Sequence, residues 1–146
     1  MPANLSGRSP KGGFARLAPE LHVIDLQKSL AFWRDRCGFE IAYERHEEGF
    51  VFLELDGAQL MLCQRHGRYE TGPLEHPLGR GVMLQIYPND IEAILKNLKA
   101  ANWQLYEEPS TKWYRAGESE RGLYQFLVQD PDGYLILFGQ SIGSRD

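Results

Sequence analysis

The chain has 146 residues, of which 42% are hydrophobic and 25% charged, and its formal net charge is −4 at pH 7. This size and composition are typical of one globular domain or of two fused half-units. The mild acidity, with no basic run beyond the N-terminal tail, argues against nucleic acids and anionic membranes as partners. No apolar run approaches the ~18 residues of a membrane span, and the first residues lack the apolar region of a signal peptide, so we expect a cytoplasmic protein.

Residues 1–15 are small, polar and rich in Gly and Pro, and we expect them to form a disordered leader. A first unit, residues 16–64, should begin with a strand in which Leu21 and Val23 alternate with Glu20 and His22. Asp25 is placed to cap a helix. The apolar stripe of that helix consists of Leu26, Leu30, Trp33 and Cys37, and Gly38 is the expected stop. Three strands, 39–44, 50–55 and 59–64, should complete a β-α-β-β-β order.

Residues 65–79 mix charged residues with Gly and Pro and predict a connection. The second unit, residues 80–141, should start with a strand containing Val82, Leu84 and Ile86. Asn89 and Glu92 then have the spacing of a capping box, and the following helix stripe consists of Ile91, Ile94, Leu95, Leu98 and Ala101. We expect a short strand at 103–106, a polar loop at 107–122 and a final hairpin with strands 123–129 and 134–139.

Two turn sequences relate the halves to each other. Asp-Pro-Asp-Gly at 130–133 separates two apolar runs and predicts a hairpin, and Asp56-Gly57 is a weaker copy. Superposing Gly57 on Gly133 aligns Met61 with Leu137 and the apolar residues on either side of them. The sequence therefore predicts an α+β protein built from two tandem βαβββ units.

Three segments in this order carry a family resemblance: Val-Ile-Asp at 23–25, SLAFWRDRCGF at 29–39 and DPDGYLILF at 130–138. The pattern resembles the vicinal oxygen chelate superfamily of glyoxalase I, extradiol dioxygenases, fosfomycin-resistance enzymes and bleomycin-resistance proteins, over residues 17–140. The resemblance implies curved mixed sheets around a cleft. It does not fix a function, because this fold hosts many chemistries.

Enzymes of this superfamily hold a divalent metal ion with His or Gln in the first strand of a unit and Glu in its last strand. The resemblance places these positions at Ala18, at Val82 or Met83, at Met61 and at Leu137. None of these side chains binds a metal that needs imidazole and carboxylate ligands. We therefore expect no cofactor and no tightly bound Zn, Fe, Mn or Ni.

Few other groups suggest catalysis. Glu20 and His22 share the mixed face of the first strand, so they are weak catalytic candidates or a solvated pair at a pocket rim. The remaining histidines, His46, His66 and His76, fall in turns or in the connection and should be surface residues. Cys37 and Cys63 lack the spacing of a metal site and should be buried, reduced, small apolar residues. No Ser-His-Asp or Cys-His order supports covalent catalysis.

Aromatic residues outside the core stripes point to ligand binding. Trp113 and Tyr114 lie in the predicted polar loop and suggest a stacking or lid role. Tyr43 resembles an aromatic position that lines the drug groove of bleomycin-binding proteins. The expected ligand-binding residues are Glu20, His22, Tyr43, Phe50, Met61, Trp113, Tyr114 and Leu137.

These observations favour a metal-independent, antibiotic-type small-molecule binding protein that resembles bleomycin resistance proteins, acts by sequestration and forms a homodimer. One alternative is a glyoxalase-like or dioxygenase-like enzyme, with an atypical metal site or a metal-free site that uses Glu20 and His22. Another is a scaffold or regulatory module, which is favoured only if the cleft is closed.

Overall fold

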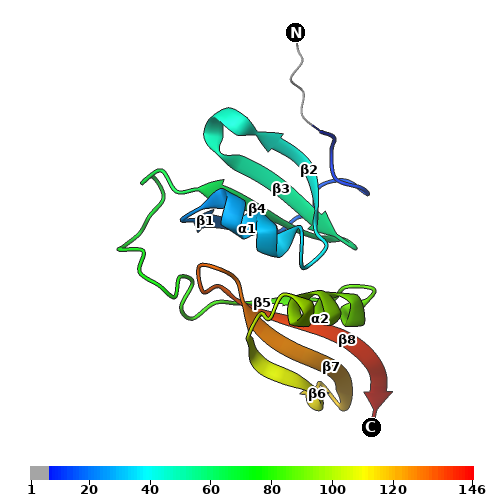
Figure 1. The fold of residues 1–146 in the computed structure, drawn as a ribbon. Helices are drawn as coiled ribbons and strands as arrows, with labels where there is room; N and C mark the ends of the chain where they lie inside the picture. The colour runs from blue at the N-terminus through cyan, green and yellow to red at the C-terminus, as the bar shows by residue number, and fades with distance from the viewer. Residues whose placement is uncertain (1–6) are drawn as a thin grey trace. The chain divides into compact units, whose positions relative to one another are not determined.

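The computed structural model describes residues 7–146, which form two compact units (Figure 1). The first unit extends to His76 and the second runs from Pro77 to Asp146. Each contains one α-helix and one four-stranded mixed sheet in the order β-α-β-β-β. The predicted α+β class and the tandem repeat are confirmed. None of the helices within residues 7–146 is long and apolar enough to cross a membrane.

In the first unit, α1 (Leu26–Trp33) lies on one face of the sheet and contacts β4 (Figure 1). The strands are β1 (Glu20–Val23), β2 (Glu40–Arg45), β3 (Phe50–Leu55) and β4 (Ala58–Gln64), in the spatial order β1-β4-β3-β2, and the 3-10 helix η2 (His46–Glu48) links β2 to β3. Asp25 caps α1 as predicted, because its carboxylate accepts hydrogen bonds from the backbone N–H groups of Gln27 and Lys28. Leu30, Trp33 and Cys37 are buried, so the predicted stripe is the core side of this segment.

The second unit repeats this plan. Its elements are β5 (Met83–Ile86), α2 (Ile91–Ala100), β6 (Leu105–Ala116), β7 (Ser119–Gln129) and β8 (Leu135–Arg145), with the strands in the order β5-β8-β7-β6. The stripe residues Ile91, Ile94, Leu95 and Leu98 are buried, as predicted. The helix cap lies one residue later than expected, since the carboxylate of Asp90, and not Asn89, accepts the N–H of Ala93.

Both predicted hairpin turns are present. Asp130 Oδ1 accepts the N–H groups of Asp132 and Tyr134 at 2.9 and 3.0 Å, and Gly133 has φ 98°. Asp56 and Gly57 both have positive φ, 49° and 93°, as a two-residue hairpin turn of type I′ requires. These turns position β4 and β8, the strands that lie next to the first strand of each unit.

The predicted polar loop at 107–122 is wrong, because these residues form the hairpin of β6 and β7. Trp113 and Tyr114 therefore lie on a strand. Most side chains of β6 are exposed, so this strand lacks the alternation of apolar and polar residues that marks a half-buried strand. Gly117, with φ 72°, lies in the turn that joins the two strands.

The expected leader also differs from the structure. Residues 1–6 lie outside the described residues, whereas residues 7–15 contact the first sheet, from Tyr43 on β2 to Gln59 on β4. Arg8 donates from its backbone N–H to the carbonyl of Ala42 at 2.7 Å, and its guanidinium pairs with Glu54. The N–H of Lys11 also donates to Glu54, at 3.0 Å. Glu54 is only 5% exposed and needs donors, and the leader supplies them.

The predicted connection at 65–79 is divided between the units. Residues 65–76 stay with the first unit, where the N–H of Arg65 donates to the carbonyl of Val23. Leu78 belongs to the second unit, where its N–H donates to the carbonyl of Asp132. The loop of residues 65–76 thus remains close to the end of β1.

Candidate functional site

The face of the first sheet that α1 does not cover carries two rows of side chains. The strand register places Tyr43, Phe52, Met61 and Glu20 opposite one another across β2, β3, β4 and β1. The neighbouring row contains Arg45, Phe50, Cys63 and His22. Most of these residues form a cluster separate from the core under the helix. This face therefore runs from an aromatic end at β2 to a polar end at β1.

The aromatic end is a stacked surface. The ring of Tyr43 stacks on that of Phe52, with 5.1 Å between centroids and 15° between planes. Phe14, from the leader, packs edge-on against Phe52 at 5.5 Å and is itself 60% exposed. Phe50 is only 3% exposed and lies beneath the guanidinium of Arg45, 3.8 Å from the ring centroid. Tyr43 and Phe14 are the accessible aromatic groups here, and the sequence pattern gave no reason to select Phe14.

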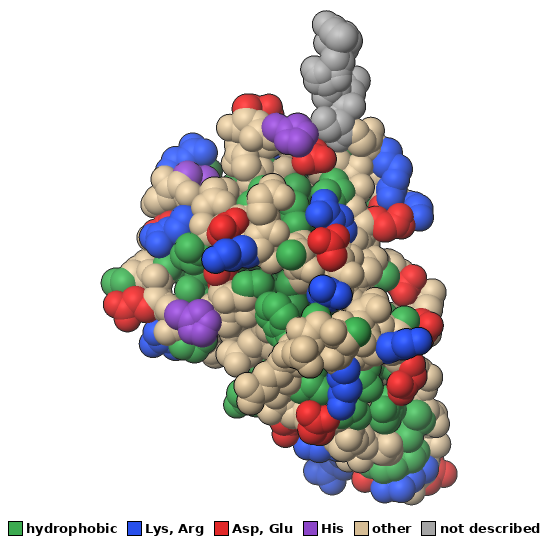
Figure 2. All heavy atoms as spheres, viewed as in Figure 1, with side chains coloured by type: hydrophobic (Ala, Val, Ile, Leu, Met, Phe, Trp, Pro, Cys, Tyr) green, Lys and Arg blue, Asp and Glu red, His purple; other side chains and the backbone are tan. Residues whose placement is uncertain are grey.

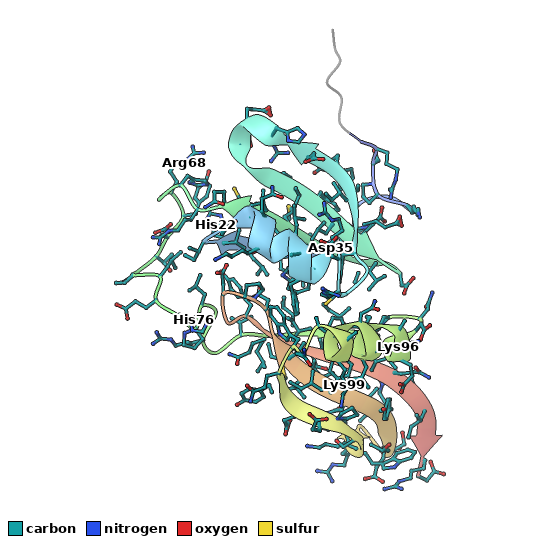
Figure 3. The ribbon with its side chains drawn as sticks, viewed as in Figure 1. His22, Asp35, Arg68, His76, Lys96 and Lys99 are labelled. Carbon is teal, nitrogen blue, oxygen red and sulfur yellow. The ribbon has the colours of Figure 1, made fainter. Side chains whose placement is uncertain are left out.

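The polar end is organised by Glu20 and His22, which lie together as the spacing i, i+2 on one strand predicts. Glu20 Oε2 is 2.9 Å from His22 Nε2, and the His22 side chain is 12% exposed. The ring of His66 lies edge-on to His22, with 5.0 Å between centroids. Figure 3 shows His22 at the end of the sheet where the loop containing Arg68 returns. His66 is exposed, as predicted, yet the loop brings it to the candidate site.

Cys63 lies opposite His22 in the register of β1 and β4 and is buried. Burial raises the pKa of its thiol, and the negative charges of Glu20 and Glu48 raise it further. A thiol with a raised pKa is protonated near neutral pH and is a poor nucleophile. The structure thus agrees with the prediction that Cys63 is buried and offers no activated thiolate.

The metal positions implied by the superfamily do not fit a metal ion. Met61 is half-buried in the first row, Leu137 is buried, and Val82 and Met83 are 55% and 41% exposed. Ala18 precedes β1 and has no donor atom in its side chain. Zn²⁺ and related ions need nitrogen, sulfur or oxygen ligands at these places, which these apolar side chains lack apart from the weakly binding thioethers of Met61 and Met83.

The second sheet has its own helix-free face. The register places Leu137 of β8 between Leu127 of β7 and Gln85 of β5. The ring of Tyr87 lies against Gly139, so that a Cβ atom added to this glycine would be 3.3 Å from the ring. The Tyr87 hydroxyl donates a hydrogen bond to Gln85 Oε1 at 2.7 Å. Glycine at this position therefore lets a tyrosine ring lie close to the sheet.

Tyr114 joins this face through Gln125. Its hydroxyl donates to Gln125 Oε1 at 2.8 Å, and Gln125 is buried although Tyr114 is 41% exposed. Tyr87 and Gln125 lacked a sequence signal, because Tyr87 lies beyond the predicted strand and Gln125 inside an apolar one. Together, Tyr87 and Tyr114 give the second sheet an accessible aromatic surface.

Trp113 lies on the opposite face from Tyr114. Trp113 is paired with Gly122 in the register of β6 and β7. The Trp113 ring lies so close to Gly122 that a Cβ atom added to this glycine would be 2.8 Å from the ring. Tyr124, two residues further along β7 and on the same face, lies near Glu92 of α2, and burial together with this carboxylate raises the pKa of its hydroxyl. The guanidinium of Arg145 covers the Trp113 ring at 4.1 Å. Since neighbouring residues of a strand point to opposite faces, Trp113 and Tyr114 do not line one surface.

A hollow of about 300 Å³ opens beside the start of α1 and is lined by Asp25, Glu44, Gln64 and Phe50, among others. Gln64 is used structurally there, because its amide accepts the N–H of Leu26 and donates to the carbonyl of Ile24. Of the predicted site residues, only Phe50 lines this hollow. Acidic and basic side chains are interspersed on the face seen in Figure 2, which agrees with the absence of a basic patch in the sequence.

Known proteins share this architecture. A virulence protein from Salmonella typhimurium is similar in structure, with a TM-score of 0.63 and 19% identity over 88% of this chain and 98% of that one. A glyoxalase/bleomycin resistance protein/dioxygenase from Alicyclobacillus acidocaldarius has a TM-score of 0.58 and 18% identity over 85% and 89%. At these identities the likeness concerns the fold alone. No curated protein sequence matches the chain.

Sequence comparison gives the family. A superfamily member from Vibrio splendidus is 40% identical over 87% of this chain and 98% of its own, with a TM-score of 0.39. The family model described as Glyoxalase matches residues 14–138, which include both units almost completely. The chain therefore belongs to the Glyoxalase/Bleomycin resistance protein/Dioxygenase superfamily.

Proposed function

We propose that this protein binds a planar, antibiotic-type small molecule and sequesters it without converting it. The observation that carries the proposal is the row Tyr43, Phe52, Met61 and Glu20, which joins a stacked aromatic surface to a carboxylate on one sheet face. A flat ring system can stack on Tyr43, and a cationic group of the ligand can pair with Glu20. Tyr87 and Tyr114 offer a second accessible aromatic surface, on the second sheet.

Two features support binding over chemistry. The superfamily's metal positions carry Ala18, Met61 and Leu137, which are poor ligands for a metal that activates substrate. Cys63 has a raised pKa and is buried, so covalent catalysis lacks a nucleophile there. The proposal also includes a homodimer and a cytoplasmic location.

Isothermal titration with metal-free bleomycin as the probe tests this function. Tyr43→Ala should weaken binding by about 1–3 kcal/mol, the range for losing a stacked aromatic contact. Trp113→Ala is the matched control. Trp113 is also aromatic, but it lies on the face of the second sheet that carries Tyr124 and α2, so its replacement should leave the affinity for bleomycin unchanged. The bound compound, recovered and analysed by mass spectrometry, should have an unchanged mass.

Two results would reject the proposal as stated. The first is the absence of saturable binding to bleomycin and to a panel of planar cationic antibiotics. The second is an equal loss of affinity in the Tyr43 and Trp113 variants, which would show that the effect is not specific to the helix-free face.

One observation favours a second candidate, a metal-free enzyme. The contact of 2.9 Å between Glu20 and His22 is the arrangement in which a carboxylate orients an imidazole that acts as a general base. If this candidate is correct, the recovered compound has a changed mass with the wild-type protein and an unchanged mass with His22→Gln.

A further inference from the structure

The polar end of the first sheet holds three side chains of metal-binding type. His22, Cys63 and His66 each offer one ligand atom, and these atoms all lie within 4.8 Å of one another. They come from β1, from β4 and from the loop that follows β4. His22 lies four residues after Ala18 and Cys63 two residues after Met61, so the cluster differs from the positions of the superfamily. Contrary to the expectation from the sequence that the chain binds no zinc, we propose that these three residues form a Zn²⁺ site.

The donor set selects the class of cation. Two imidazoles and a thiolate suit Zn²⁺, whereas Mg²⁺ and Ca²⁺ prefer oxygen ligands. The Cys63 thiol would release its proton to solvent when the ion binds. Bonds of about 2.0–2.3 Å to a tetrahedral Zn²⁺ place its ligand atoms about 3.5 Å apart. The cluster must therefore close slightly around the ion. His66 lies in an exposed loop and can supply that movement, while His22 and Cys63 are fixed by the sheet.

Hydrogen bonds already orient both imidazoles. His22 Nε2 is engaged by Glu20 at 2.9 Å, and His66 Nδ1 accepts the N–H of Arg68 at 3.1 Å. The cation would accordingly be held by Nδ1 of His22 and Nε2 of His66. A carboxylate hydrogen-bonded to a metal-binding histidine fixes the ring and increases its basicity, and this is the common second partner of metal-binding imidazoles.

An ion pair within the loop that carries His66 keeps this residue near the cluster. Arg65 donates from Nε and Nη2 to the two carboxylate oxygens of Glu70, at 3.0 and 2.7 Å. Around Cys63, the negative charges of Glu20 and Glu48 oppose the positive charges of Arg45 and Arg68. Acidic and basic groups therefore both surround the thiol.

Three protein ligands leave the fourth position of a tetrahedral ion to water or to another ligand. This position would lie on the same sheet face as Met61 and the aromatic end. The inference goes beyond the proposed sequestration and does not depend on it.

Isothermal titration of the full chain with Zn²⁺ alone should give one bound ion per chain. His66→Ala, on an exposed loop, should weaken the affinity at least ~10-fold, and Glu20→Gln, which removes the orienting carboxylate, by about 10–100-fold. His46→Ala is the matched control, since His46 is an exposed histidine of η2 outside the cluster, and it should bind Zn²⁺ like the wild type.

Co²⁺ gives an independent readout of the thiolate. The wild-type protein should show a thiolate-to-cobalt charge-transfer band, and Cys63→Ala should lose it while Cys37 remains. If Cys63→Ala does not fold, as judged by circular dichroism, the His66→Ala titration decides. The proposal is overturned by a lack of saturable Zn²⁺ binding, by unchanged affinity in His66→Ala, or by a band that persists without Cys63. The bleomycin test uses metal-free ligand and Tyr43, so either proposal can fail alone.

Discussion

The carboxylate of Glu54, on the inner strand β3 of the first sheet, is buried and relies on donors from residues 8 and 11. Arg8→Ala should lower the free energy of unfolding by about 1–3 kcal/mol, because it removes a charged partner from a buried acceptor. The value lies below that of a fully buried ion pair, since the Arg8 side chain is 40% exposed. Urea denaturation measures the change.

Lys11→Ala is the control for this prediction. Its ammonium pairs with Glu40 at 3.2 Å, but both side chains are more than half exposed. Exposed ion pairs contribute about 0–1 kcal/mol, and the backbone N–H that serves Glu54 is retained in the variant. Equal destabilisation by the two substitutions would show that the leader does not satisfy Glu54 through Arg8.

The contacts of some site residues could be predicted from the sequence, and those of others could not. The pairing of Glu20 with His22 follows from strand alternation alone. The approach of His66 to His22 depends on how the loop of residues 65–76 returns, and no local pattern encodes that path. Cys63 was identified as a buried strand residue, but its position opposite His22 requires the register of two strands that are forty residues apart.

At the scale of elements, the two hairpin turns permit a matched comparison. Gly57 and Gly133 both have strongly positive φ, so a side chain at either position costs about 1–3 kcal/mol in backbone strain. An added Cβ meets open space at Gly57, but at Gly133 it lies 2.6 Å from the Cα of Pro77. Gly133→Ala should therefore lower the melting temperature more than Gly57→Ala. Equal shifts would show that backbone strain alone accounts for the cost.

Both helices and both turns could be predicted because their signals are local. Asp25 precedes an apolar stripe, and Asp-Gly sequences fix positive φ where the chain reverses. The hairpin of β6 and β7 was missed because it extends beyond the core, where Lys112 and Arg115 need not alternate with apolar residues. Consequently the sequence placed Trp113 and Tyr114 in one loop, although they point to opposite faces of a strand.

At the scale of the whole molecule, the repeat is what made the fold predictable. Superposing the two Asp-Gly turns aligned Met61 with Leu137, and both residues lie on the face of their sheet that the helix does not cover. The family then follows from the order of the elements and from the match over residues 14–138. The ligand does not follow, because the superfamily's metal positions carry apolar residues in this chain.

The proposed homodimer is a prediction at this scale. Each unit covers one face of its sheet with a single helix, and Phe14, Tyr87 and Tyr114 remain 41–60% exposed on the other faces. Apolar sheet faces are normally covered by a second layer, and symmetric pairing of identical chains is the commonest way to provide one. Light scattering at low micromolar concentration should give about twice the 16.7 kDa of the chain. A stable monomer that binds bleomycin would show that binding needs only one chain. The dimer would then have no part in the function.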